Sequence, residues 1–135
     1  MRRFFVLAVI AISAACGSGP TTNNPPASPF HVRVEGTPSH SPNQAGDEVF
    51  AITVKVTDKA SGDSVPNQKI VLQLSVGSAS PTSPTSAANG RAGIIWTVPA
   101  ASTTGTQAIA FCAPGPGTAF CKTSLSGTDA FQYAF

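Results

Sequence analysis

The sequence predicts an all-β domain built as an antiparallel β-sandwich of about seven strands, and three observations lead to this expectation. Apolar residues recur at every second position in successive segments, which is typical of strands with one buried face. Gly, Pro and Asn gather between these segments, as they do in the turns of all-β proteins. Beyond the first 15 residues, no segment free of Gly and Pro shows the apolar spacing of an amphipathic helix.

The alternation also predicts the individual strands. In residues 48–58, one face carries only apolar side chains, namely Phe50, Ile52, Val54 and Val56. Trp96 and Tyr133 have the same parity in their own segments, so we expect both in the core. The expected strands are 30–36, 48–58, 69–77, 91–99 and 106–112, and segments 119–127 and 129–135 are expected to form one strand broken at Gly127 or two short strands.

The N-terminus has the pattern of an export signal. Two arginines precede an unbroken apolar run, 4–12, which is much shorter than the roughly 20 residues of a membrane-spanning helix. Ser13-Ala14-Ala15-Cys16 resembles the bacterial lipoprotein box, although Ser13 stands where the box prefers Leu. The resemblance implies that residues 1–15 are removed and that Cys16 carries the lipid anchor. An ordinary signal peptide, cut after Ala15 and leaving a free thiol, is the alternative.

Residues 16–29 are expected to be a disordered tether, followed by the folded domain at 30–135. Gly, Ser and Asn make this stretch flexible, and Pro25, Pro26 and Pro29 favour extended backbone. Gly17 and Ser18 follow the cysteine, so no aspartate that retains lipoproteins at the inner membrane is present there. The lipoprotein resemblance therefore implies sorting to the outer membrane, on either its periplasmic or its surface face.

The charge balance excludes some partners. Arg2 and Arg3 account for the full-chain charge of +2, so removing the leader leaves a neutral chain. Nucleic-acid binding needs clustered cations that neutralise phosphates, and we therefore expect none. Neutrality also argues against peripheral membrane binding through a basic patch.

Several turn motifs follow one another in a distinctive order between residues 43 and 112. They are Val56-Thr57-Asp58, Gly62, Val65-Pro66, Asn89-Gly90-Arg91-Ala92 and Gly105-Thr106. Their order resembles that of group 1 bacterial immunoglobulin-like domains, the invasin and intimin type. The resemblance implies an immunoglobulin-like sandwich and suggests adhesion, although turn 59–64 is longer than in that family and segment 112–121 is an addition. A transthyretin-like sandwich of the carboxypeptidase-regulatory type shares much of the pattern and is the alternative fold.

These motifs also have a local physical meaning. Asp58 can accept hydrogen bonds from backbone amides just after its strand, and Gly62 permits a positive φ there. Asn89-Gly90 is a strong tight-turn pair, which lets Ala92 enter the core directly.

Cys112 and Cys121 bracket the sequence APGPGTAF. In an oxidising envelope compartment, we expect them to form a structural disulfide as opposed residues of a hairpin. Free or redox-active thiols are the alternative. His31 and His40 are too distant in sequence to complete a metal site with them, so we expect no metal and no cofactor.

Nothing in the sequence predicts catalysis. His31 is expected in an edge strand and His40 in a solvated loop, and Asp47-Glu48 is the only adjacent pair of acids. No serine-nucleophile signature is present.

We therefore expect a non-enzymatic, lipid-anchored module of the bacterial envelope. Its loops 77–90 and 113–119 would meet a protein or glycan partner, for adhesion or as a spacer. One alternative is a periplasm-facing accessory subunit of an envelope complex. Another is a small envelope hydrolase or a protease inhibitor that uses the Pro-Gly loop.

Overall fold

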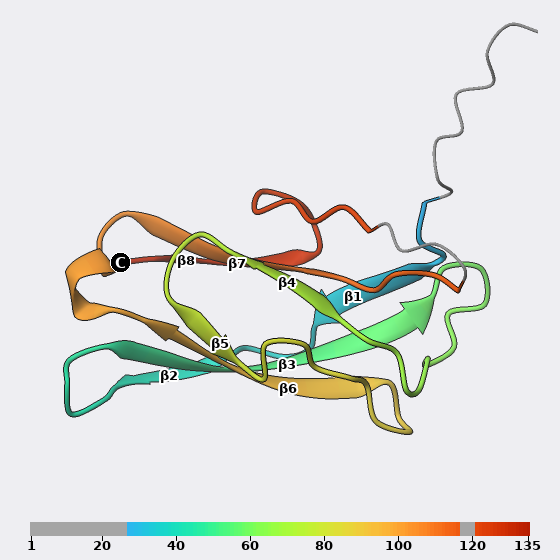
Figure 1. Cartoon of the computed structure of the whole chain (residues 1–135), viewed down its shortest axis with the longest axis horizontal. Coiled ribbons are helices and arrows are strands. Elements are labelled where there is room, and N and C mark those ends of the chain that lie inside the picture. The colour runs from blue at the N-terminus through green and yellow to red at the C-terminus, as the bar shows by residue number, and fades with distance from the viewer. Residues whose placement is uncertain (1–26, 117–120) are drawn as a thin grey trace, which may run out of the picture.

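The computed structural model describes residues 27–116 and 121–135. The expected signal peptide, most of the expected tether and Cys16 lie outside these residues. Within them, the chain forms eight strands and one short 3-10 helix (Figure 1). These elements are β1 (Phe30–Val34), β2 (Ser39–Pro42), β3 (Glu48–Asp58), β4 (Val71–Leu74), β5 (Ser78–Ser80), β6 (Arg91–Val98), η1 (Ala100–Ser102), β7 (Thr106–Cys112) and β8 (Ala130–Ala134).

The strands form two antiparallel sheets packed face to face (Figure 1). One sheet has the order β1-β3-β6-β5, with β2 also paired to β3, and the other has the order β4-β7-β8. Strands β1 and β2 pair with successive parts of β3, through Val34↔Val54 and Ser39↔Ala51, so together they make one interrupted edge strand. This arrangement is the ABED and CFG order of a constant-type immunoglobulin domain. The predicted immunoglobulin-like sandwich is therefore confirmed.

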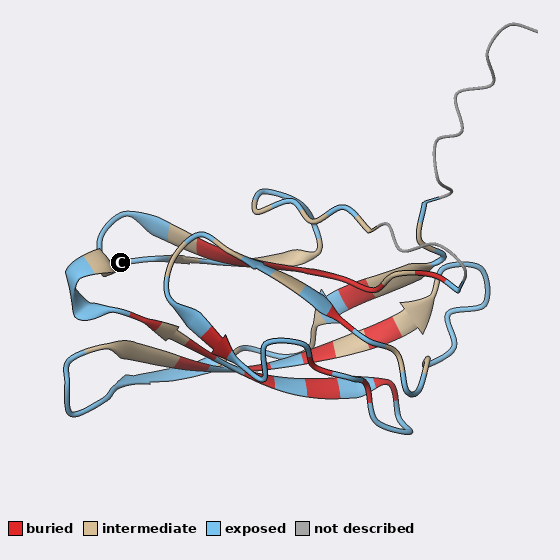
Figure 2. Cartoon of the chain, in the orientation of Figure 1, coloured by how far each residue is buried: buried red, intermediate tan, exposed pale blue. Residues whose placement is uncertain are grey.

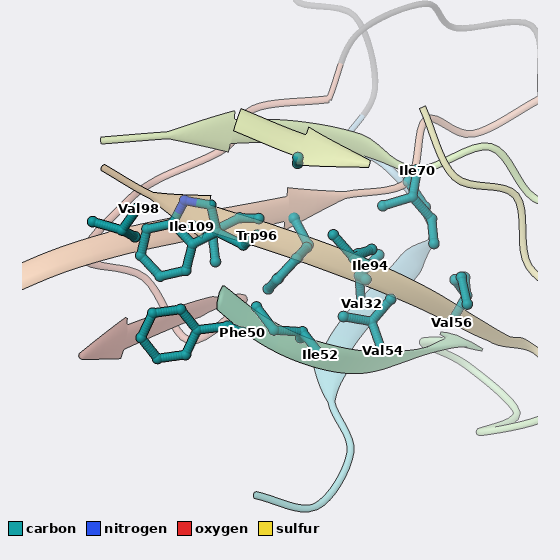
Figure 3. Close-up of a cluster of buried hydrophobic side chains, with 14 residues drawn as sticks. Val32, Phe50, Ile52, Val54, Val56, Ile70, Ile94, Trp96, Val98 and Ile109 are labelled. Carbon is teal, nitrogen blue, oxygen red and sulfur yellow. The ribbon is translucent and has the colours of Figure 1, made fainter. Parts of the chain in front are cut away.

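The core lies between the sheets and follows the predicted alternation. Buried and exposed residues alternate along β3 and β6 (Figure 2). Phe50 and Trp96 are both 0% exposed, with their ring centroids 5.1 Å apart. The indole Nε1 of Trp96 donates to the carbonyl oxygen of Val76 at 2.9 Å, which satisfies its only polar atom. Trp96 is thus a core residue as predicted, whereas Tyr133 is only half-buried. Figure 3 shows a cluster of the buried hydrophobic side chains of this core.

The tail differs from its prediction. No strand forms over the described part of segment 119–127, and β7 instead pairs with β8, for example through Ile109↔Phe131. A turn closed by the Gly127 amide and the Ser124 carbonyl, 3.1 Å apart, precedes β8. The alternating aromatic residues of β8 pack against Phe50 and Trp96, an apolar burial that the Ser- and Thr-rich segment 121–127 could not supply.

The sandwich has two distinct ends. At the proximal end, where the described chain begins at Ala27, the Lys59 amide donates to the Pro29 carbonyl and the Val56 amide donates to the Gly90 carbonyl, both at 2.8 Å. At the distal end, the Phe135 amide donates to the Gly105 carbonyl at 2.9 Å (Figure 1).

The loops that were expected to meet a partner can be placed relative to these two ends. The Ser28 hydroxyl donates to the Ala113 carbonyl, so the start of segment 113–119 lies at the proximal end, and so does Gly90 at the close of 77–90. Segment 77–90 is also not a plain loop, because β5 within it pairs with β6. The parts of the chain at the end opposite Ala27 are the β2–β3 turn, η1 and the last residue of β8 with Phe135 (Figure 1).

Candidate functional site

The predicted turn after β3 forms as expected. The Asp58 carboxylate accepts hydrogen bonds from the amides of Ala60 and Ser61 at 2.8 and 2.9 Å. The backbone N–H groups of Ser61 and Ala60 hold the pKa of the Asp58 carboxyl below its ordinary value. Gly62 has a φ of +79°, the left-handed conformation that glycine permits. Asp58 and Gly62 are therefore engaged in shaping the turn.

The other motif residues are also structural. Asn89 accepts a hydrogen bond from the Arg91 amide at 3.0 Å, and Gly90 has a φ of +76°. A Cβ on Gly90 would lie 2.8 Å from the Val56 carbonyl oxygen, so glycine is needed for close packing there. Gly105 has a φ of +67° at the start of β7, and Pro66 lies exposed between β3 and β4.

Cys112 and Cys121 stand at disulfide distance, with their Cα atoms 5.9 Å apart. They are not hairpin partners, however, and that expectation is wrong. Cys112 ends β7 opposite Val71 of β4, while Cys121 lies in a segment without strand structure. The pair therefore fastens the long β7–β8 connection to the proximal end of the sandwich.

Replacing both cysteines by alanine is expected to lower the free energy of unfolding. The pair spans nine positions of sequence, and closing a loop of that length stabilises a fold by about 2.5 kcal/mol on the chain-entropy model. Urea unfolding of the wild type and of Cys112→Ala/Cys121→Ala measures this loss, and a reductant should produce it in the wild type while leaving the double variant unchanged. Alkylation of both thiols in the folded, unreduced protein would show that no disulfide exists.

A cluster of rings at the distal end was missed by sequence reasoning. His40 lies in the strand β2 rather than in a loop, so the expected loop is wrong, although its side chain is exposed as expected. Its Nδ1 contacts the Glu48 carboxylate, and its Nε2 lies 3.1 Å from the hydroxyl of Tyr133. The imidazole centroid is 5.2 Å from that of Phe50 and 4.8 Å from that of Tyr133. We call His40, Phe50, Tyr133 and Phe135 the distal ring cluster.

The distal ring cluster joins the two sheets and holds its exposed members in place. His40 comes from the β2 edge of one sheet and Tyr133 from the β8 edge of the other. With Nδ1–H donating to Glu48, Nε2 is free to accept from the Tyr133 hydroxyl. Phe135 then packs edge-on against Tyr133, with centroids 4.9 Å apart. The result is a fixed aromatic surface with a carboxylate beside it.

One sequence signal could have placed His40. Residues 43–46, Asn-Gln-Ala-Gly, form the turn between β2 and β3, in which Asn43 accepts hydrogen bonds from the amides of Ala45 and Asp47. Treating residues 44–46 as a hairpin loop closed by Asn43 and Asp47 pairs His40 with Phe50, as the structure does.

Two further surfaces have a defined chemical character. Arg33, Lys55 and Arg91 lie in one row across β1, β3 and β6, on the face of the sheet that points away from the core. On the outer face of the other sheet lies an open groove of about 500 Å³. Neutral hydroxyl and amide side chains dominate the groove, whose lining includes Gln73, Ser75, Thr106, Thr123, Ser124, Ser126 and Gln132.

No group of three or more His, Cys, Asp or Glu side chains within 27–116 and 121–135 could hold a metal ion. Nor does this part of the chain contain a helix long and apolar enough to cross a membrane.

Comparison with known proteins assigns no family. No protein-family model matches the chain, and the search of curated proteins also finds no match. Because immunoglobulin-like sandwiches carry many unrelated functions, the fold does not select among them. The surfaces described above are therefore the basis for a functional proposal.

Proposed function

We propose that the chain is a non-enzymatic, lipid-anchored immunoglobulin-like module of the bacterial envelope that binds a protein or glycan partner through its distal ring cluster. The export leader and the lipoprotein-like Ser13-Ala14-Ala15-Cys16 support the anchor and the address. The Pro-, Ser- and Asn-rich residues that follow support a tether. The order of turn motifs, which resembles invasin-type domains, supports an interaction role.

The observation that carries this proposal is the partial exposure of rigid aromatic side chains. Phe135 is 38% exposed, and so is the side chain of His40. Tyr133 is half-buried, and its hydroxyl is held by His40. Aromatic side chains that are already ordered lose little conformational entropy when they bind, and they dominate the energetics of many interfaces. Tyrosine and phenylalanine faces also pack against sugar rings as well as against protein.

The position of the cluster favours the same role. Ala27, the first described residue, lies at the opposite end of the sandwich (Figure 1). A domain tethered through residues 16–26 would therefore hold the distal ring cluster on the side away from its anchor. Glu48 contacts His40 of the cluster and adds negative charge beside it, so a partner with cationic or hydroxyl groups would complement it.

A substitution at Phe135 tests the binding surface. We expect Phe135→Ser to weaken capture of an envelope protein or an arrayed glycan by about 30-fold, the effect of losing an aromatic hot spot. Ile95→Thr is the matched control, because Ile95 is similarly exposed on the outer face of β6 and should leave binding unchanged. Equal capture by both variants and the wild type would reject the distal ring cluster as the binding surface.

The anchor is tested separately. Mass spectrometry of the processed protein should find Cys16 as the first residue, carrying fatty acids. Protease treatment of intact cells then separates the surface and periplasmic locations, because only a surface-exposed domain is cleaved. A processed chain with an unmodified Cys16 would reject the lipid anchor and leave the binding test unaffected.

A further inference from the structure

Arg33, Lys55 and Arg91 form a row of cations on the outer face of the larger sheet. This arrangement is unfavourable for the stability of the fold. Arg33 lies directly opposite Lys55, and Lys55 lies directly opposite Arg91. Side chains that face each other in this way have Cβ atoms about 5 Å apart, and like charges in directly opposite positions are destabilising. Of these three cations, only Arg91 has an ion-pair partner among the described residues, and that partner is Glu35.

A cleft lies beside this row. It has a volume of about 370 Å³ and is formed by β1, the end of β3 and the turn that follows β3. Four outward-facing residues of β1 and β3 make a square within it, since His31 lies opposite Thr57 and Arg33 lies opposite Lys55. The cleft therefore places a hydroxyl, an imidazole and two cations on one small surface.

The acidic groups in the cleft are already engaged. The Glu35 carboxylate accepts hydrogen bonds from the Nε and Nη2 atoms of Arg91, the latter at 2.7 Å. The Asp58 carboxylate accepts the two turn amides described above. Lys59 donates to the Ser28 carbonyl at 2.7 Å. Within the described residues, this leaves Arg33 and Lys55 as the cations of the cleft with no hydrogen-bond or ion-pair acceptor.

His31 is the fourth member of the square. Its Nδ1 is buried and has no hydrogen-bond partner among the described residues. The unpartnered Nδ1 places no hydrogen-bond constraint on the ring, so the other ring nitrogen can carry the N–H that is donated to an anion.

We infer that Arg33, Lys55, His31 and Thr57 form a binding site for a phosphate group. The Arg33 guanidinium can donate two parallel hydrogen bonds to a pair of phosphate oxygens, and the Lys55 ammonium acts as a point charge. Thr57 and His31 supply donors for the remaining oxygens, which a planar carboxylate would not need. The phosphate can belong to an anionic lipid headgroup or to a soluble phosphorylated molecule. This site lies on the outer face of β1 and β3 and does not depend on the distal ring cluster.

Titration with inorganic phosphate tests the site in the full mature chain, with Cys16→Ser to prevent acylation. At constant ionic strength, we expect saturable NMR shifts of the backbone amides in β1 and at the end of β3. Arg33→Gln/Lys55→Gln should weaken phosphate binding about tenfold or more. Lys69→Gln/Lys122→Gln removes the same charge from exposed positions outside the cleft and should weaken binding less than about twofold.

Two further measurements complete the test. Arg33→Gln/Lys55→Gln should melt close to the wild-type temperature, because neither side chain has an ion-pair partner among the described residues, and this shows that its loss of binding is not a loss of folding. Sedimentation with phosphatidylglycerol vesicles, but not with phosphatidylcholine vesicles, identifies a lipid headgroup as the source of the phosphate. Phosphate binding without vesicle binding identifies a soluble ligand. The absence of saturable shifts, or an equal loss in the Lys69→Gln/Lys122→Gln variant, would overturn the site.

Discussion

Replacing Trp96 by alanine is expected to lower the free energy of unfolding by about 4 kcal/mol. The side chain is fully buried between the sheets, where it packs against Phe50 and Phe131. Its removal leaves a cavity that the two sheets can only partly close. It also leaves the Val76 carbonyl without the indole donor. Domains of this size have total stabilities of about 5–15 kcal/mol, so the variant should be close to unfolding at ambient temperature.

The neighbouring residue provides the control. Ile95 is 44% exposed on the opposite face of β6, so Ile95→Ala should cost less than about 1 kcal/mol. Urea unfolding of the control can be followed by the fluorescence of Trp96, the single tryptophan of the chain. The Trp96→Ala variant lacks this signal, so circular dichroism is used to compare both variants. Similar losses from the two substitutions would contradict the burial of one face of β6 against the second sheet.

Replacing Gly77 by alanine is expected to cost about 3 kcal/mol or more. Gly77 has a φ of +81°, and a Cβ there would lie 2.0 Å from the carbonyl oxygen of Thr97. Because that oxygen belongs to the backbone of β6, the chain must move to relieve the overlap. The movement would disturb the pairing of Ser78 with Thr97 and the neighbouring acceptor of the Trp96 indole.

Gly36→Ala separates the two causes of this cost. Gly36 has a similar φ of +72°, but no atom lies within 4 Å of the position a Cβ would take. Its substitution should therefore show only the conformational cost of a positive φ, about 1–2 kcal/mol. The difference in thermal stability between the two alanine variants measures the additional destabilisation caused by the overlap with the Thr97 carbonyl oxygen at Gly77. Equal melting temperatures would show that no close approach exists.

The strands with a strong apolar alternation were predictable from the sequence. Segments 48–58 and 106–112 match β3 and β7 at both ends, because their buried positions are filled by apolar residues without interruption. Segment 69–77 was predicted too long, since only Val71–Leu74 is a strand, although Ile70, Leu72, Leu74 and Val76 do pack toward the core.

The strands without such alternation could not be found in this way. All four residues of β2 are exposed, and β5 has three residues of which only Ala79 is buried. Both owe their structure to a neighbouring strand that supplies hydrogen-bond partners, β3 for β2 and β6 for β5. The local sequence of β2 and β5 therefore does not predict these strands.

The candidate sites were harder to predict than the fold, because they too depend on contacts between strands that are distant in the sequence. His40 and Tyr133 are 93 positions apart, and they meet only because β2 and β8 lie at neighbouring edges of the two sheets. Arg33, Lys55 and Arg91 are aligned by strand register. The small net charge of the chain, +2, concealed this alignment, since a net charge contains no information about where the charges lie.

The interruption between β1 and β2 has a consequence for crowded surroundings. An unbroken strand at the margin of a sheet offers a continuous row of backbone groups onto which another chain can add, which is the first step of aggregation. Here Gly36 and Pro38 break that row, and Pro42 closes it with a residue that has no amide hydrogen. The opposite margin, β5, is only three residues long. Neither margin of the larger sheet therefore offers a long continuous row of backbone groups to a neighbouring copy.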